Sequence, residues 1–218
     1  SRWMVKPNQL AMQELKRLGR YLKKVPYVVQ EFKLQRLPKV IRVYVDSDHA
    51  GDLWSRKSTT GMVTMVGLHT LRQTSNLQST VSLSSGESEY YALVKGAAFG
   101  LSCQSMYRDF GIYMDVEVLS DSSAARSFAS RRGLGKQRHV HTRYLWIQER
   151  VANKDLKITK VGTHVNISDL LTKTLSVKVR EQHLRTMGFR RFSECLAKRK
   201  AVQSQFATTT TTMTKEGT

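Results

Sequence analysis

The chain has 218 residues, 40% of them hydrophobic, with 36 Lys and Arg against 17 Asp and Glu for a formal net charge of +19. The length and apolar content suit one globular domain with extensions, and no run of 18 apolar residues occurs, which excludes a membrane span. The excess of positive charge makes nucleic acid the expected partner, because a basic protein that binds phosphates releases counterions.

Basic residues gather in two parts of the sequence. Residues 178–200 are strongly basic, and a charged tail on a neutral domain would explain that part. The segment RRGLGKQRHVHTR, at 131–143, is also basic but lies between elements of the expected core. This second location favours nucleic-acid binding over a basic tail alone.

The two cysteines, Cys103 and Cys195, lie far apart and have no CxxC partners. We therefore expect reduced thiols in a reducing, intracellular compartment and no zinc site. The chain opens with SRWMVKP, without an initiator Met or a signal-peptide pattern, so we expect a segment of a longer polypeptide or a processed product.

In the first half of the chain the pattern predicts one helix and three strands. Residues 9–24 carry leucines at helical spacing with basic residues between them, which predicts an amphipathic helix that ends before Pro26. Residues 39–48 are β-branched and aromatic and predict a first strand. Residues 61–76 predict two more strands joined by a tight turn near Gly67.

The second half alternates helices and strands. The expected elements are a long serine-capped helix over 84–111, a strand over 116–121 with a helix directly after it, an amphipathic helix over 140–153, a strand over 156–161 and a short helix over 167–175. Three consecutive strands followed by this alternation predict an α/β fold with a mixed sheet and helices on its faces. The final ATTTTTMTKEGT has low complexity and is expected to be disordered.

Four carboxylates fall where expected strands end or expected helices begin: Asp46, Glu89, Asp121 and Asp169. Each alone has an ordinary explanation as a turn former, a helix cap or a solvated side chain. If the first and fourth strands are neighbours, however, Asp46 and Asp121 lie side by side, and the other two are able to reach the same edge. A divalent cation would relieve their mutual repulsion, and oxygen ligands suit Mg²⁺ or Mn²⁺ and not zinc. Two such ions would support phosphodiester cleavage, so the pattern indicates a nuclease.

Five blocks, in order over residues 44–175, carry a resemblance to a known family. They are YVDSDHAGDLWSRKSTTGMV, STVSLSSGESEYYAL, LSDSSAA, RHVHTRYLWIQERV and ISDLLTKTL. They resemble the ribonuclease H domain at the carboxyl end of the Pol polyprotein of copia-type (Pseudoviridae) long-terminal-repeat retrotransposons. Upstream, SRWMVKPNQLAMQELKRLGRYLK is similar to the end of the reverse transcriptase of that polyprotein.

The resemblance implies a ribonuclease H-like fold, with a five-stranded mixed sheet and helices on both faces. It implies that residues 1–38 are the end of the reverse transcriptase and that 39–176 form the ribonuclease H-like domain. The resemblance extends to about residue 189, and residues 190–218 fall outside it. We also expect a basic C-terminal helical extension over 177–206 and a disordered tail over 207–218. The paired aspartates of the polymerase motif are absent from this sequence, so we do not expect it to polymerise DNA.

Carried over by position, the resemblance implies that the catalytic metal ligands are Asp46, Glu89, Asp121 and Asp169, holding two Mg²⁺ or Mn²⁺ ions. Glu87 competes with Glu89 for this role, and Glu89 is preferred because it directly precedes the YYAL match. Asp48 is a candidate to support the ligands, with a turn residue as the alternative.

Further residues match the family outside the carboxylates. His164 resembles a histidine that assists departure of the product in many ribonucleases H. The expected nucleic-acid contacts are Arg56, Lys57, Lys136, Arg138, His139 and Arg143. For His139 and Arg143, which match an H-x-x-x-R pattern, binding of backbone phosphate and packing of the helix remain alternatives; for the others the alternative is a solvated basic face.

The implied activity is hydrolysis of the RNA strand of an RNA–DNA hybrid, with the reverse transcriptase domain of the same polyprotein as a partner. The expected location is intracellular, in cytoplasmic virus-like particles or the nucleus. The sequence departs from the family pattern at His49, Ser122 and Thr174, none of which is an expected ligand. These departures leave an alternative open, a catalytically inactive nucleic-acid-binding remnant.

Overall fold

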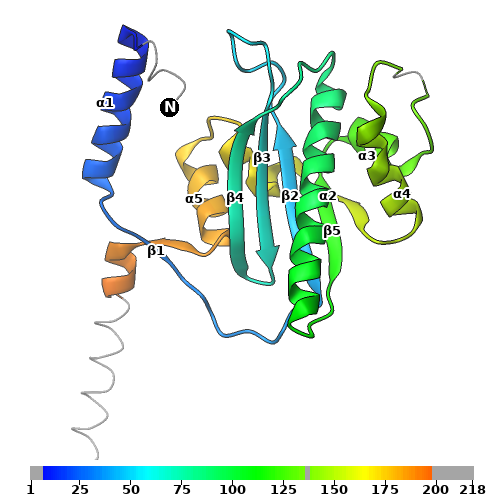
Figure 1. Cartoon of the computed structure of the whole chain (residues 1–218). Helices are drawn as coiled ribbons and strands as arrows, with labels where there is room; N and C mark the ends of the chain where they lie inside the picture. Colours follow the sequence, from blue (N-terminus) through cyan, green and yellow to red (C-terminus); the bar gives the residue numbers. More distant parts are fainter. Residues whose placement is uncertain (1–6, 136–137, 198–218) are drawn as a thin grey trace, which may run out of the picture. The chain divides into compact units, whose positions relative to one another are not determined.

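The computed structural model describes residues 7–135 and 138–197, which belong to two compact units (Figure 1). Of the described residues, 7–31 and 189–197 belong to one unit, and 32–135 and 138–188 belong to the other. The expected disordered tail at 207–218 lies outside the described residues. The domain boundaries implied by the resemblance stay predictions.

The first unit contains one long helix and a small sheet. Helix α1 (Gln9–Lys24) has the bounds that the sequence predicts, and it begins where the Asn8 side chain accepts a hydrogen bond from the Ala11 backbone N–H at 2.8 Å. Strands β1 (Val28–Gln30) and β7 (Phe189–Arg191) pair antiparallel. These two strands were not predicted, because three residues are too few to show an alternating pattern.

The second unit is built on a five-stranded sheet. Its strands, in chain order, are β2 (Val40–Ser47), β3 (Thr59–Val66), β4 (His69–Leu77), β5 (Asp115–Ser120) and β6 (Lys157–Lys160). Their order across the sheet is β4-β3-β2-β5-β6. The first three strands pair antiparallel, whereas β5 and β6 are added parallel to β2. The expected five-stranded mixed sheet is therefore confirmed, with the first and fourth of its strands adjacent.

Helix α2 (Ser85–Asp109) crosses one face of this sheet (Figure 1). Two glycines allow the close approach: a Cβ at Gly96 would lie 2.5 Å from Val45 Cγ1, and one at Gly100 would lie 2.6 Å from Val116 Cγ1. Helix α3 (Ser123–Ser130) packs against α2. The main core thus lies between α2 and the side chains of β2 and β5 that face it.

The opposite face of the sheet carries the short 3-10 helix η3 (Ile167–Leu171). Asp46 follows Val45 in β2, so its side chain leaves the sheet on the face opposite to that of Val45. Gly61 is the β3 partner of Asp46, and a Cβ at Gly61 would lie 2.8 Å from the Ser168 carbonyl oxygen of η3. Helical segments therefore cover both faces, as expected. The helix α5 (Val177–Thr186) follows η3 and contacts it.

Three helix predictions need correction. The helix expected over 140–153 begins as the 3-10 helix η1 (Thr142–Leu145) and becomes the α-helix α4 (Trp146–Ala152) only afterwards. The segment 167–175 is helical only over η3. The expected helical extension is interrupted after α5, because Gly188 adopts a left-handed φ of 84° that ends the helix before β7. Among the described residues, no helix has the length and apolar character that crossing a membrane requires.

Candidate metal centre

Three carboxylates converge where β2 and β5 end. Asp46 lies near the end of β2, Asp121 directly follows β5, and Glu89 lies in the second turn of α2. One carboxylate oxygen from each lies within 4.8 Å of the others, and Asp46 is fully buried. Adjacent parallel strands end at the same edge, which is why two aspartates 75 positions apart meet.

The Glu89 carboxylate is buried with incomplete hydrogen bonding. Its Oε1 accepts a 3.4 Å hydrogen bond from the Ser47 backbone N–H, while Oε2 is buried with no hydrogen-bond partner among the described residues. Burial, together with the charges of Asp46 and Asp121, raises the pKa of Glu89 to about 8. A buried carboxylate oxygen without a partner, near two more carboxylates, matches the ligand set of a hard divalent cation such as Mg²⁺ or Mn²⁺.

Asp169 is joined to this cluster through a lysine. The Lys173 ammonium donates to Asp46 Oδ1 at 3.0 Å and to Asp169 Oδ1 at 3.2 Å. Thr172 also donates its hydroxyl proton to Asp46 Oδ2. Burial and the charge of Asp46 raise the pKa of Asp169 to about 6, although Lys173 opposes this shift. All four expected ligands therefore lie in one neighbourhood, but Asp169 is not in the group of three.

Asp121 is positioned by the segment that follows β6. The Thr163 hydroxyl, in the 3-10 helix η2 (Thr163–Val165), donates to Asp121 Oδ2 at 3.0 Å. Ser122 caps α3 by accepting a hydrogen bond from the Ala125 backbone N–H at 3.3 Å, so Asp121 is not used as that cap. His164 is the next residue after Thr163 and is exposed. The structure thus places His164 on the segment that contacts Asp121.

Glu87, the competitor of Glu89, belongs to a separate hydrogen-bond network. It accepts hydrogen bonds from the Tyr91 hydroxyl at 2.5 Å, the Leu83 backbone N–H at 2.9 Å and His139 Nε2 at 3.0 Å. Burial alone would raise the pKa of Glu87, but these hydrogen bonds outweigh burial and lower it. The structure therefore brings Glu89, and not Glu87, to the other carboxylates.

The expected nucleic-acid contacts are spread over two segments. His139 is committed to Glu87, and the Arg143 guanidinium donates to the Tyr144 hydroxyl at 2.8 Å while lying 4.8 Å from the centre of that ring. Both residues therefore contribute to packing around η1. Arg138 is exposed, and Lys136 lies outside the described residues.

Arg56 and Lys57 lie on the loop between β2 and β3. Arg56 is exposed and adopts a left-handed φ of 57°, and Lys57 is half-buried. The Asp48 carboxylate accepts a hydrogen bond from the Thr59 backbone N–H, which closes this loop. Asp48 therefore acts as a loop-closing residue, as the turn alternative predicts.

Sequence reasoning missed three side chains of the centre: Thr163, Thr172 and Lys173. The last two stand in the block ISDLLTKTL, directly after the recognised Asp169. Their presence in that block was a signal, but only the fold shows that both reach Asp46.

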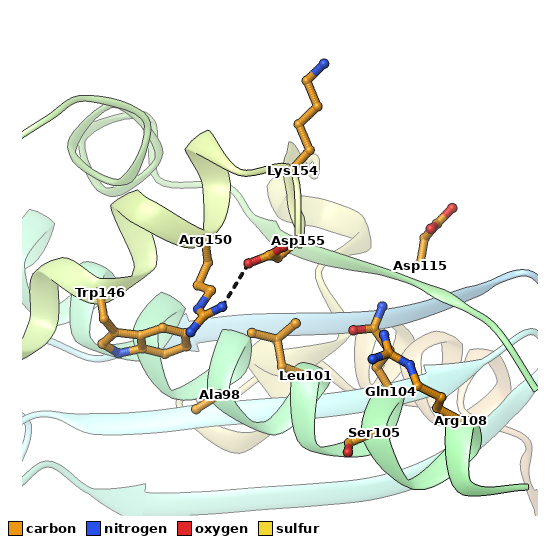
Figure 2. A pocket seen from close by; sticks show the side chains of 10 residues that line it. All are labelled: Ala98, Leu101, Gln104, Ser105, Arg108, Asp115, Trp146, Arg150, Lys154 and Asp155. Carbon is orange, nitrogen blue, oxygen red and sulfur yellow. Dashed lines mark hydrogen bonds and ion pairs between the residues drawn. The ribbon is translucent and has the colours of Figure 1, made fainter.

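A pocket of about 580 Å³ lies elsewhere in the second unit (Figure 2). The later turns of α2 and the α4 region line it, and Arg150 and Asp155 form a 3.0 Å ion pair there. The first α2 residue that lines it, Ala98, follows Glu89 by nine positions, a rise of about 14 Å along a helix, and none of the four carboxylates lines the pocket. The pocket is therefore separate from the carboxylates.

The chain resembles known polyproteins in sequence, although no family model matches it. It is 30% identical over 138 residues to the retrovirus-related Pol polyprotein from transposon TNT 1-94 of Nicotiana tabacum, which covers 62% of this chain and 10% of the relative. It is 28% identical over 179 residues to that from transposon RE1 of Arabidopsis thaliana, covering 81% of this chain and 12% of the relative. The chain thus spans about a tenth of the length of these relatives.

Among solved structures, the chain is similar to the N-terminal RNase H domain of a Mycobacterium tuberculosis protein, solved as a fusion with maltose-binding protein. The identity is 15% and the TM-score 0.43, over 67% of this chain and 97% of that one.

Proposed function

We propose that this chain, whose homologues are Pol polyproteins of copia-type plant transposons, is a metal-dependent ribonuclease H that cleaves the RNA strand of an RNA–DNA hybrid. The observation that carries the proposal is the group of Asp46, Glu89 and Asp121, with its unpartnered buried oxygen on Glu89. The net charge of +19 supports a polyanionic substrate.

The four carboxylates would hold two divalent ions between them. Asp46, Glu89 and Asp121 would hold one ion, and Asp46 with Asp169 the other; such ions, when bound, lower the pKa of an attacking water and stabilise the departing 3′ oxygen. Thr163 orients Asp121 through its hydrogen bond, and Thr172 does the same for Asp46. These contacts hold the carboxylates in place before substrate binds. The ligand side chains therefore need little rearrangement during the reaction.

Substrate binding rests on phosphate contacts and helix shape. Arg56 and Lys57 are the basic residues that we expect to contact phosphate, because their loop directly follows the strand that carries Asp46. Selection of the RNA strand would come from contacts to 2′-hydroxyls in the minor groove. The partners in this proposal are the hybrid and the reverse transcriptase domain of the same polyprotein, in an intracellular setting.

The experiment that tests the proposal is cleavage of a hybrid whose two strands carry different labels, in Mg²⁺, in Mn²⁺ and in EDTA. The wild type is compared with Asp121→Asn and with Asp115→Asn, a matched control because Asp115 is exposed at the opposite end of the same strand. We expect metal-dependent cutting of the RNA strand alone, retained in Asp115→Asn and lost in Asp121→Asn. Tight, salt-sensitive binding without cutting in either metal would instead identify the inactive nucleic-acid-binding remnant.

A further inference from the structure

Lys173 occupies a specific place in the candidate metal centre. Its ammonium bridges Asp46 and Asp169, at 3.0 and 3.2 Å, whose side chains are 1% and 7% exposed. The group of Asp46, Glu89 and Asp121 shares Asp46 with this ion pair, and its Glu89 has a buried oxygen without a hydrogen-bond partner among the described residues. The four acids thus form two groups that share Asp46: Asp46, Glu89 and Asp121 in one, and Asp46 with Asp169 in the other. Lys173 contacts both members of the second group but only Asp46 of the first.

The Lys173 backbone is fixed by a helical hydrogen bond, whereas its side chain is partly exposed to solvent. The Lys173 backbone N–H donates to the Asp169 carbonyl oxygen at 2.9 Å, so the two residues are one helical turn apart. The side chain is 41% exposed and carries its charge on a flexible four-carbon stem. Lys173 is therefore able to swing its ammonium into solvent without any change in the backbone.

We propose that Lys173 is a built-in substitute for one of the two divalent ions, holding the Asp46–Asp169 pair until an ion displaces it. This inference rests on the proposed function, because it requires that the carboxylates bind metal. The first ion would enter the group of Asp46, Glu89 and Asp121, where Lys173 contacts Asp46 and can keep its contact with Asp169. The second would have to displace the ammonium, so Lys173 would make loading of the second ion the weaker and controlled step.

Formal charges support this order of loading. One divalent ion together with the ammonium leaves four ionised carboxylates one charge short of neutral, and a second ion added beside the ammonium would make the centre positive. Two ions without the ammonium neutralise the four acids. Because the ammonium holds both carboxylates through charge-assisted hydrogen bonds, we expect the competition to weaken binding of the second ion by at least about tenfold.

The test measures metal binding without substrate. Calorimetric titration with Ca²⁺ and with Mn²⁺ is carried out on the wild type, Lys173→Met, Lys173→Arg and Lys178→Met. Lys178 is the matched control because it is exposed on α5 and belongs to neither carboxylate group. We expect Lys173→Met to bind the second ion at least about tenfold more tightly than the wild type, with Lys173→Arg and Lys178→Met at wild-type affinity or below.

Thermal unfolding supplies a second measurement that separates this role from a purely structural one. In EDTA, Lys173→Met should unfold at a lower temperature than the wild type, because the Asp46 and Asp169 carboxylates lose the cation that pairs them. In saturating Mg²⁺ the difference should disappear or reverse. An equal loss in both conditions, or an unchanged second affinity, would show that Lys173 is only a structural ion pair. Absence of metal binding by every variant would overturn this inference together with the metal centre itself.

Discussion

His139 Nε2 lies 3.0 Å from Glu87 Oε2, and this contact joins the loop before η1 to the first turns of α2. Since the Glu87 carboxylate accepts, His139 donates. The histidine of the H-x-x-x-R pattern therefore hydrogen-bonds to α2, the helix that also carries Glu89 two positions beyond Glu87. This places the two neighbouring glutamates in different roles, one in support and one in the centre.

The different roles predict opposite effects for two matched substitutions. Glu87→Gln should lower the free energy of unfolding by about 1 to 3 kcal/mol, because a buried acceptor of several hydrogen bonds loses its charge, yet leave metal affinity near the wild-type value. Glu89→Gln should abolish metal-dependent cleavage and weaken metal binding without loss of stability in EDTA. Urea unfolding and metal titration of both variants check this. The reverse pattern would make Glu87 the ligand.

The raised pKa values predict how stability depends on pH without metal. The pKa of Glu89 rises from 4.5 to about 8 and that of Asp169 from 3.8 to about 6 in the folded protein. The folded state therefore holds protons that the unfolded state has released, so these groups favour folding at low pH and this contribution is lost as pH rises. As the pH rises from about 4.5 to 8, the raised pKa of Glu89 should lower the free energy of unfolding by up to a few kcal/mol.

Urea unfolding in EDTA across this pH range measures the effect. The wild type should lose stability toward pH 8, and Glu89→Gln should lose much less over the same range. Saturating Mg²⁺ should remove the loss in the wild type, because metal binds the deprotonated carboxylates. A wild-type profile in EDTA that matches that of Glu89→Gln would contradict the pKa assigned to Glu89.

The packing of α2 on the sheet predicts a sensitive position at Gly96. An added Cβ would lie 2.5 Å from Val45 Cγ1, next to Asp46. Gly96→Ala should therefore destabilise by about 1 to 3 kcal/mol through overpacking, even though alanine favours helices by about 1 kcal/mol. Gly19→Ala, in α1, is the control: nothing lies within 4 Å of its added Cβ, so the urea midpoint should stay or rise. Equal midpoints for both variants would mean that α2 has room to shift.

The sequence was sufficient for the sheet and for the main carboxylates. Strand periodicity located β2 and β5, and an Asp at the end of each was enough to place Asp46 and Asp121 together once those strands were expected to be neighbours. Cap and turn signals also located the long helix, Ser85–Asp109. They did not separate Glu89 from Glu87, and Glu89 was preferred because it directly precedes the YYAL match.

The remaining features depend on tertiary contacts that no local pattern encodes. In the sequence, nothing distinguishes Lys173 from a surface lysine. It pairs with Asp46 only because η3 packs over Gly61, the neighbour of Asp46 across the sheet. Similarly, β1 and β7 lie far apart in the chain, and each becomes a strand only by pairing with the other. The 3-10 turns η1 and η3 carry helical patterns, so periodicity alone assigned them to α-helices.

The loop between β2 and β3 predicts a salt-dependent contribution to substrate binding. If Arg56 and Lys57 each bind a phosphate, the double substitution Arg56→Gln and Lys57→Gln should weaken hybrid binding for all sequences alike. It should also reduce the slope of log affinity against log salt by about 1 for each phosphate that is no longer neutralised.

Arg108→Gln is the control, because Arg108 is a basic residue in the last turn of α2. Fluorescence anisotropy with a labelled hybrid, in Ca²⁺ over a range of salt concentrations, measures both quantities. A double variant that keeps the wild-type slope would mean that this loop is a solvated basic face, and the phosphates would then have to be bound from elsewhere on the chain.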